Sequence, residues 1–229
     1  MMWILFLGTL IVSALAAARV QANYARFSRV AAGSGLSGAE TAEEILGTAG
    51  IHDVEVIAGE GLLGDHYDPM HKRLVLSEAN YFGRSVAALG VAAHEAGHAI
   101  QHARAYAPLQ LRMTAIGLTS FASQIVMWLP VVGLVTGILS TYTGLAMMAV
   151  GWGIIMAFNL ITTLPVEFDA SRRAKQVLRG MGIIDSGAEA EGVSSVLNAA
   201  AWTYVAAFLT SLVYFLWYLA PLLGGTRRD

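Results

Sequence analysis

Four long apolar stretches constrain this chain more than any other feature of its sequence. They run over residues 2–20, 115–135, 141–164 and 199–223. A helix of about 20 apolar residues spans a hydrocarbon layer about 30 Å thick. Only 13% of the residues are charged, whereas a soluble globular domain carries about 25%. The sequence therefore predicts a polytopic membrane protein with about four transmembrane helices.

The two polar segments between these stretches, residues 21–113 and 165–198, are predicted to lie on the same side of the membrane. The second and third stretches separate them, and a chain that crosses twice returns to its starting side. Cytoplasmic segments carry an excess of lysine and arginine. Such residues follow the first stretch and crowd the second polar segment: Arg19, Arg26, Arg29, Arg172, Arg173, Lys175 and Arg179. These charges predict a protein of the cell membrane whose polar segments face the cytoplasm.

The first apolar stretch is interpreted as a retained anchor. Ala14-Leu15-Ala16 has the small residues of a signal-peptide cleavage site. However, no basic residue precedes the apolar run, whereas a signal peptide begins with a positively charged region. This order of charges favours an anchor whose N-terminus faces outward.

Local patterns predict a small α+β portion within the first polar segment. A capping-box spacing predicts a helix over residues 37–49. Runs of β-branched and aliphatic residues at 54–57 and 74–76 predict two short strands. Ser77 is then expected to cap a long helix that continues to about Ala103.

The second polar segment begins where a proline disturbs the preceding helix. Pro165 follows the third apolar stretch, and proline breaks or bends a helix because it lacks an N–H group. Residues 170–182 predict a new helix that ends at glycine. The expected fold is therefore mainly α, and residues 1–229 are expected to form a single membrane domain.

Composition also excludes several kinds of function. The chain contains no cysteine, which excludes disulfides, thiolate zinc sites and cysteine nucleophiles. Its net charge of -2 argues against nucleic acid as a partner, because no large basic face can replace counterions on the phosphates. Any metal ion must be held by histidine, aspartate or glutamate.

The pentapeptide His94-Glu95-Ala96-Gly97-His98 lies within the predicted long helix. Residues four apart lie on the same helix face, about 6 Å apart along the axis. The two imidazoles can therefore converge on one zinc ion, at nitrogen–zinc distances of about 2.0–2.1 Å. Glu95 lies beside the ligand face and can accept a proton from a zinc-bound water. The motif predicts one zinc ion per chain, with His94 and His98 as ligands and Glu95 as the catalytic base.

Two histidines and a glutamate at this spacing can also form a buried, hydrogen-bonded group that binds no zinc. Such a motif arises by chance in about one chain per hundred of this length. The flanks, residues 86–93 and 96–100, are almost wholly apolar. Ionisable groups in apolar surroundings are costly unless they are paired or bind metal, which favours zinc. Gly97 indicates either the close approach of another segment or ordinary small-residue packing of helices.

A catalytic zinc site needs a third protein ligand and an open position for water. The candidates in the polar segments are His52, His66, His71, Glu167 and Asp169. Glu167 is favoured, because it follows Pro165 at the predicted membrane boundary, where a neighbouring helix can present it to the two histidines. Asp169 is expected to pair with Arg173 at the i+4 position instead.

The remaining histidines are assigned structural or surface positions. His66 and His71 flank a predicted turn and are expected to line the cleft or the surface. His102 continues the helical spacing of the motif, but it lies about 12 Å from His94 along the helix axis. It is therefore expected to be structural.

Five sequence blocks occur in order along most of the chain: Asp65–Pro69, Leu76–Glu78, Val91–Gln101, Leu164–Ala174 and Val196–Ala206. Together they resemble the YugP-like neutral zinc metallopeptidases of bacterial membranes. The resemblance implies a zincin-like catalytic portion with several transmembrane helices, which acts on peptides or proteins. Carried over by position, it makes His94, His98 and Glu167 the zinc ligands and Glu95 the base.

The segment Glu167–Ser171 is more distantly similar to the Glu-x-x-x-Asp element of HtpX-type and CAAX-type membrane gluzincins. This chain has Ser171 where that element has aspartate. The aspartate position would serve to hold a ligand histidine through its other ring nitrogen. The resemblance therefore implies that this support is weaker here or comes from another residue.

The predicted function is that of a zinc-dependent membrane endopeptidase. Two alternatives remain open: a site-2-type intramembrane protease, whose metal motif lies inside a span, and a non-catalytic metal-binding membrane scaffold. The expected partners are a peptide or protein substrate, the lipid bilayer, and a second membrane protein or a second copy of the chain.

Overall fold

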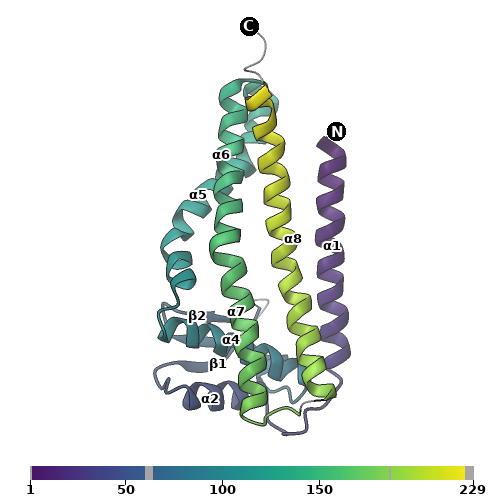
Figure 1. Ribbon diagram of the computed structural model, residues 1–229, viewed down its shortest axis with the longest axis vertical. Helices are drawn as coiled ribbons and strands as arrows, with labels where there is room; N and C mark the ends of the chain where they lie inside the picture. The colour runs from purple at the N-terminus through teal and green to yellow at the C-terminus, as the bar shows by residue number, and fades with distance from the viewer. Residues whose placement is uncertain (1, 60–63, 186, 225–229) are drawn as a thin grey trace. The chain divides into compact units, whose positions relative to one another are not determined.

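Helices dominate the computed structural model, which describes residues 2–59, 64–185 and 187–224 (Figure 1). The predicted mainly α architecture is confirmed, together with a small three-stranded sheet. In chain order the elements are α1 (Met2–Phe27), α2 (Gly38–Thr48), β1 (Glu55–Gly59), β2 (His66–Asp68), β3 (Arg73–Ser77), α3 (Glu78–Tyr81), α4 (Val86–Ala103), α5 (Ala107–Thr136), η1 (Ile138–Ser140), α6 (Tyr142–Phe158), η2 (Asn159–Thr163), α7 (Leu164–Gly180) and α8 (Ala188–Gly224).

Four helical runs in the described chain are long and apolar enough to cross a membrane. They are Trp3–Phe27, Ala107–Thr136, Tyr142–Gly180 and Ala188–Gly224. Each predicted apolar stretch coincides with the apolar part of one of these runs. The runs are longer than the predicted spans because the helices continue into the polar segments.

The chain divides into two compact units by its internal contacts. The first comprises Met1–Ser13, Gln110–Pro165 and Tyr204–Asp229, and the second comprises Ala14–Leu109 and Val166–Thr203. The first unit holds most of the apolar helical length, including a small cluster of buried side chains: Leu129, Met148, Ala149 and Tyr218. The second unit holds the sheet and the larger hydrophobic core.

The sheet of the second unit has the strand order β1-β3-β2. β3 pairs in parallel with β1 and antiparallel with β2. Leu74 and Leu76 of β3 are fully buried, in the same core cluster as Leu89 of α4. β1 and β3 match the two predicted strands. β2 was not predicted, because its three residues are too few to show an alternating pattern.

Helix α2 confirms the predicted capping box. The Glu40 backbone N–H donates to Ser37 Oγ (3.2 Å), and the Ser37 N–H donates to Glu40 Oε2 (2.7 Å). The apolar face of α2 buries Ile45 and Leu46 in the core. α2 packs mainly against α4, the helix that carries the predicted metal motif.

The long helix predicted from Ser77 to Ala103 is wrong in one respect, because the chain leaves the helical path at residues 82–85. There the backbone pairs with the segment after α1: the Ala32 N–H donates to Arg84 O (3.0 Å) and the Val86 N–H donates to Val30 O (2.9 Å). These bonds use groups that a continuous helix would need. Ser85 then caps α4, accepting a hydrogen bond from the Ala88 N–H at 3.2 Å.

The helix after Pro165 begins earlier than predicted, at Leu164 rather than near residue 170. Because Pro165 lacks an N–H group, it cannot bond the carbonyl four residues before it. The turn before it adopts the wider π geometry over Asn159–Thr163, and the Leu164 N–H donates to the Asn159 carbonyl. Proline therefore widens the helix here without ending it.

Candidate metal centre

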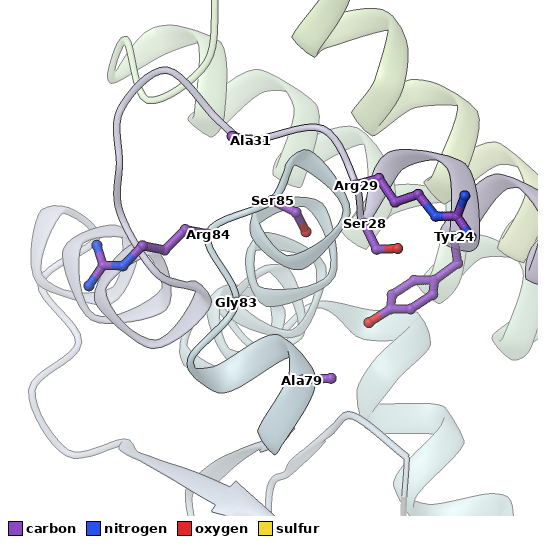
Figure 2. Close-up of a pocket in the computed structure, with 8 residues that line it drawn as sticks. All are labelled: Tyr24, Ser28, Arg29, Ala31, Ala79, Gly83, Arg84 and Ser85. Atoms are coloured by element: carbon purple, nitrogen blue, oxygen red, sulfur yellow. The ribbon is translucent and has the colours of Figure 1, made fainter.

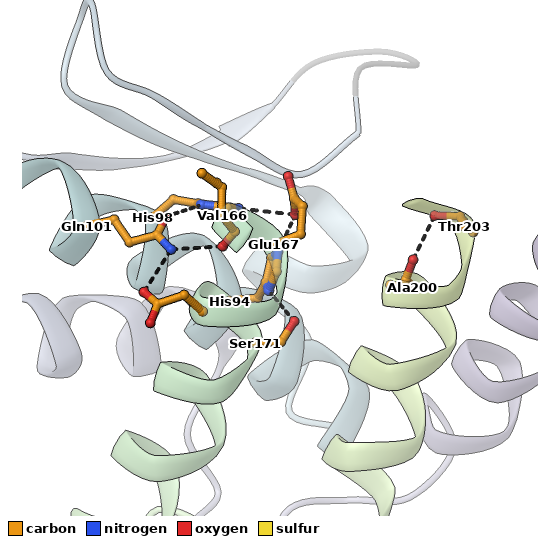
Figure 3. Close-up of polar contacts among 9 residues, drawn as sticks. His94, His98, Gln101, Val166, Glu167, Ser171, Ala200 and Thr203 are labelled. Atoms are coloured by element: carbon orange, nitrogen blue, oxygen red, sulfur yellow. Dashed lines mark hydrogen bonds and ion pairs between the residues drawn. The ribbon is translucent and has the colours of Figure 1, made fainter. Parts of the chain in front are cut away.

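The structure brings together the three side chains that the sequence predicted as zinc ligands (Figure 3). His94 and His98 project from α4, and Glu167 comes from the first turn of α7. Their ligand atoms all lie within 4.8 Å of one another. His94 Nε2 is 3.3 Å from Glu167 Oε2, and His98 Nε2 is 3.5 Å from the same oxygen.

These distances fit a zinc ion. Two ligand atoms about 2.0–2.1 Å from a tetrahedral zinc ion lie about 3.4 Å apart, close to the two nitrogen–oxygen distances in this cluster. The Glu167 side chain is only 4% exposed, and both histidine side chains are largely buried. Buried imidazole nitrogens with a carboxylate form a donor set typical of catalytic zinc. The cluster therefore has the donor atoms of a zinc site, and its two nitrogen–oxygen distances match the spacing of zinc ligands.

Gly97 explains how α7 comes close enough to α4. A Cβ atom on Gly97 would lie 2.9 Å from the Ala170 carbonyl oxygen and 3.3 Å from Ala170 Cα. The backbone of α7 therefore occupies the space that any other residue at position 97 would fill. Both interpretations of this glycine hold, since the close approach beside the ligands is itself a helix-packing contact.

Each histidine of the cluster has a side-chain partner at its other ring nitrogen. His94 Nδ1 lies 3.2 Å from Ser171 Oγ, and His98 Nδ1 lies 3.0 Å from Gln101 Oε1. Ser171, which stands where the related element has aspartate, contacts His94, and a different residue contacts His98. Gln101 is not among the residues predicted from the sequence, although its position three residues after His98 places it on the same helix face.

The comparison with known proteins agrees with this geometry. A family profile described as "Putative neutral zinc metallopeptidase" matches residues 2–222. The chain belongs to this metallopeptidase family. A relative from Bacillus subtilis (strain 168), named "Putative membrane protease YugP", is 42% identical over 215 residues, covering 92% of each chain. No solved structure matches the chain significantly. The match to the family includes both helices that carry the cluster.

Glu95 lies on α4 directly after His94, and only 7% of its surface is exposed. Its charge acts on the neighbouring His98. Burial alone would lower the pKa of the His98 imidazole, but the nearby carboxylates of Glu167 and Glu95 raise that pKa above its ordinary value. Glu95 therefore lies near the cluster but is not one of its three potential ligands, His94, His98 and Glu167.

The other candidate residues lie outside the cluster. Asp169 pairs with Arg173, as predicted, and also with Arg172. His102 Nδ1 lies 2.9 Å from the Tyr67 hydroxyl, a structural contact between α4 and β2. Three exposed histidines lie elsewhere in this polar region: His52, His66 and His71. Among the described residues, only the group of His94, His98 and Glu167 brings three such side chains together.

A separate cavity of about 490 Å³ lies in the second unit, away from these ligands (Figure 2). It is lined by Tyr24, Ser28, Arg29, Ala31, Ala79, Gly83, Arg84 and Ser85. The Arg84 guanidinium points out of this cavity and pairs with Glu40 at 3.2 Å. Because none of the cluster residues lines this cavity, it is not the space around the metal centre.

Proposed function

We propose that this family member is a zinc-dependent membrane endopeptidase that hydrolyses peptide bonds in peptide or protein substrates. The observation that carries the proposal is the convergence of His94, His98 and Glu167, in which both imidazoles lie at the spacing of zinc ligands from the same carboxylate oxygen. Membership of a zinc metallopeptidase family and the apolar helices support it. Three protein ligands leave one tetrahedral position for water, as in catalytic zinc sites.

The three clustered residues and Glu95 would have different roles in hydrolysis. The Nε2 atoms of His94 and His98 and a carboxylate oxygen of Glu167 would hold the ion, which supplies Lewis acidity and lowers the pKa of bound water to about 7. Glu95 would accept the proton of the attacking water and return it to the leaving amine nitrogen. Its buried position beside His94 supports this role.

An extended substrate segment would pair with β2. This strand lies at one edge of the sheet order β1-β3-β2 and contacts α4. No described strand pairs with its outer side. Peptides commonly bind to such edges through backbone hydrogen bonds, with side-chain pockets adding specificity.

The arrangement favours this function over a site-2-type protease. In a site-2 protease the metal motif lies inside a membrane span. Here α4 is not among the four candidate spans found in the described chain, and it packs against α2 and the sheet. The motif therefore belongs to the polar second unit.

Removing the metal tests the proposal directly. We expect the protein purified in detergent to contain about one zinc ion per chain and to cleave unfolded protein substrates. A chelator should remove the zinc and the cleavage together, and added zinc should restore both. Elemental analysis and a gel-based cleavage assay measure the two quantities on the same sample. Cleavage that persists in the zinc-free protein would refute the proposal.

The proposed cytoplasmic position of the site predicts a labelling pattern in this cysteine-free chain. The His71 side chain is 70% exposed, so His71→Cys should react with a thiol reagent wherever the reagent reaches it. In intact cells, an impermeant reagent should leave this cysteine unlabelled, and permeabilisation should make it reactive. The matched control is Ser140→Cys, at the exposed turn between α5 and α6, which should react in intact cells. The reverse pattern would invert the topology.

A further inference from the structure

We propose that Gln101 is a positioning residue that fixes the ring tautomer of His98 and links α4 to the backbone beside Glu167. This inference rests on the proposed metal site but does not depend on the reaction that the site performs. Gln101 has no exposed surface, and its side chain lies between the two helices that carry the ligands. Figure 3 shows it beside His98 and Val166.

The orientation of the Gln101 amide follows from its partners. Its Nε2 atom lies 2.8 Å from the Val166 carbonyl oxygen and 3.0 Å from Asp169 Oδ2. A carbonyl oxygen and a carboxylate oxygen only accept hydrogen bonds, so both must face the NH₂ group. The amide oxygen must then face His98 Nδ1, 3.0 Å away. The reversed amide would place oxygen against two acceptors in a site without exposed surface.

The orientation of the amide decides which nitrogen of His98 carries the proton. An amide oxygen only accepts a hydrogen bond, so the Nδ1 atom of His98 must donate. A neutral imidazole carries one N–H, which leaves the lone pair on Nε2. That atom faces the cluster, 3.5 Å from Glu167 Oε2. The other tautomer would put a hydrogen where the metal bond must form.

His94 lacks such a constraint and serves as an internal comparison. Its Nδ1 atom faces the Ser171 hydroxyl at 3.2 Å. A hydroxyl both donates and accepts, so this contact is compatible with either tautomer of His94. The two ligand histidines are thus supported differently, and only the support of His98 selects a proton position.

The same amide also links the two ligand helices. Val166, whose carbonyl accepts from Gln101, directly precedes Glu167 on α7. Asp169, the other acceptor, is held in turn by Arg172 and Arg173. These arginines offset the negative charge of a carboxylate whose side chain is almost fully buried. One glutamine therefore aligns a ligand on α4 and restrains the backbone of the helix that supplies the third ligand.

The first test is the tautomer itself. In zinc-free protein labelled with ¹⁵N-histidine, the Nδ1 atom of His98 should carry a proton even at about pH 9, where an ordinary imidazole is neutral. The Gln101→Met variant keeps the side-chain length without the amide, and its His98 should populate both tautomers. An Nδ1 atom without a proton on His98 in the unmodified protein would overturn the proposal, even if the variant failed to fold.

The second test is zinc affinity, measured by competition with a chelator. Loss of a residue that orients a metal ligand typically weakens binding about 10–100-fold, and we expect a loss in this range for Gln101→Met. Ser171→Ala should lose less, because its hydroxyl selects no tautomer. Equal affinity in wild type and Gln101→Met would overturn this inference and leave the proposed function intact. Absence of zinc binding in wild type would instead overturn the proposed function.

Discussion

Glu95→Gln should reduce hydrolysis about 10²–10⁴-fold while the purified protein keeps about one zinc ion per chain. Glutamine preserves the shape of the buried side chain but cannot accept the proton of the attacking water. Because Glu95 is not one of the three clustered ligand residues, we expect the ion to be held without its carboxylate. The measurements are kcat/KM on a peptide substrate and zinc content by elemental analysis.

The matched control for this variant is Glu43→Gln. Glu43 is an exposed residue of α2, and the same chemical change there should leave both activity and zinc content unaltered. Loss of zinc together with activity in Glu95→Gln would identify Glu95 as a ligand and contradict its assignment as the base. A wild-type protein that binds zinc without cleaving any substrate would favour the non-catalytic scaffold instead.

Glu167→Ala should lose both zinc and activity. It removes the oxygen that lies 3.3 Å from His94 Nε2 and 3.5 Å from His98 Nε2, leaving only two protein ligands. The loss of affinity should exceed the 10–100-fold that follows removal of a residue supporting a ligand. Zinc content and a dissociation constant from chelator competition measure the effect.

Two control variants separate the loss of a ligand from general damage to the site. Asp169→Ala removes a neighbouring carboxylate of the same helix, and His66→Ala removes an exposed histidine on β2. Both should retain most of their zinc. Helix content measured by circular dichroism should be the same in all three variants. If Glu167→Ala retained one zinc ion per chain with wild-type affinity, another residue would have to be the third ligand.

The elements that the sequence predicted well are those set by local patterns. The apolar stretches are long enough to span a membrane without any knowledge of their neighbours. The capping box of α2 is likewise satisfied within one turn, between Ser37 and Glu40. The i, i+4 spacing of His94 and His98 is a property of a single helix. In each case the information lies within a short window of the chain.

The features that the sequence did not predict depend on distant backbone partners. The break at residues 82–85 arises because Arg84 and Val86 bond to the segment around residue 31, which no local pattern around Ser77 reveals. The Gln101 contacts reach Val166 and Asp169 on another helix. The place of Glu167 after Pro165 favours it as the third ligand, but its distance from the histidines depends on the packing of α7 against Gly97.

The ligand set is divided by the two apolar helices α5 and α6, which lie between His98 and Glu167 in the chain. During synthesis the two histidines emerge well before the carboxylate that completes the cluster. A growing chain that ends before α7 therefore offers two of the three ligands. With the proposed ligand set, we expect full zinc affinity only after both intervening helices have been made and α7 has packed against α4. The proposed peptidase activity should therefore be absent until most of the apolar helices have been synthesised.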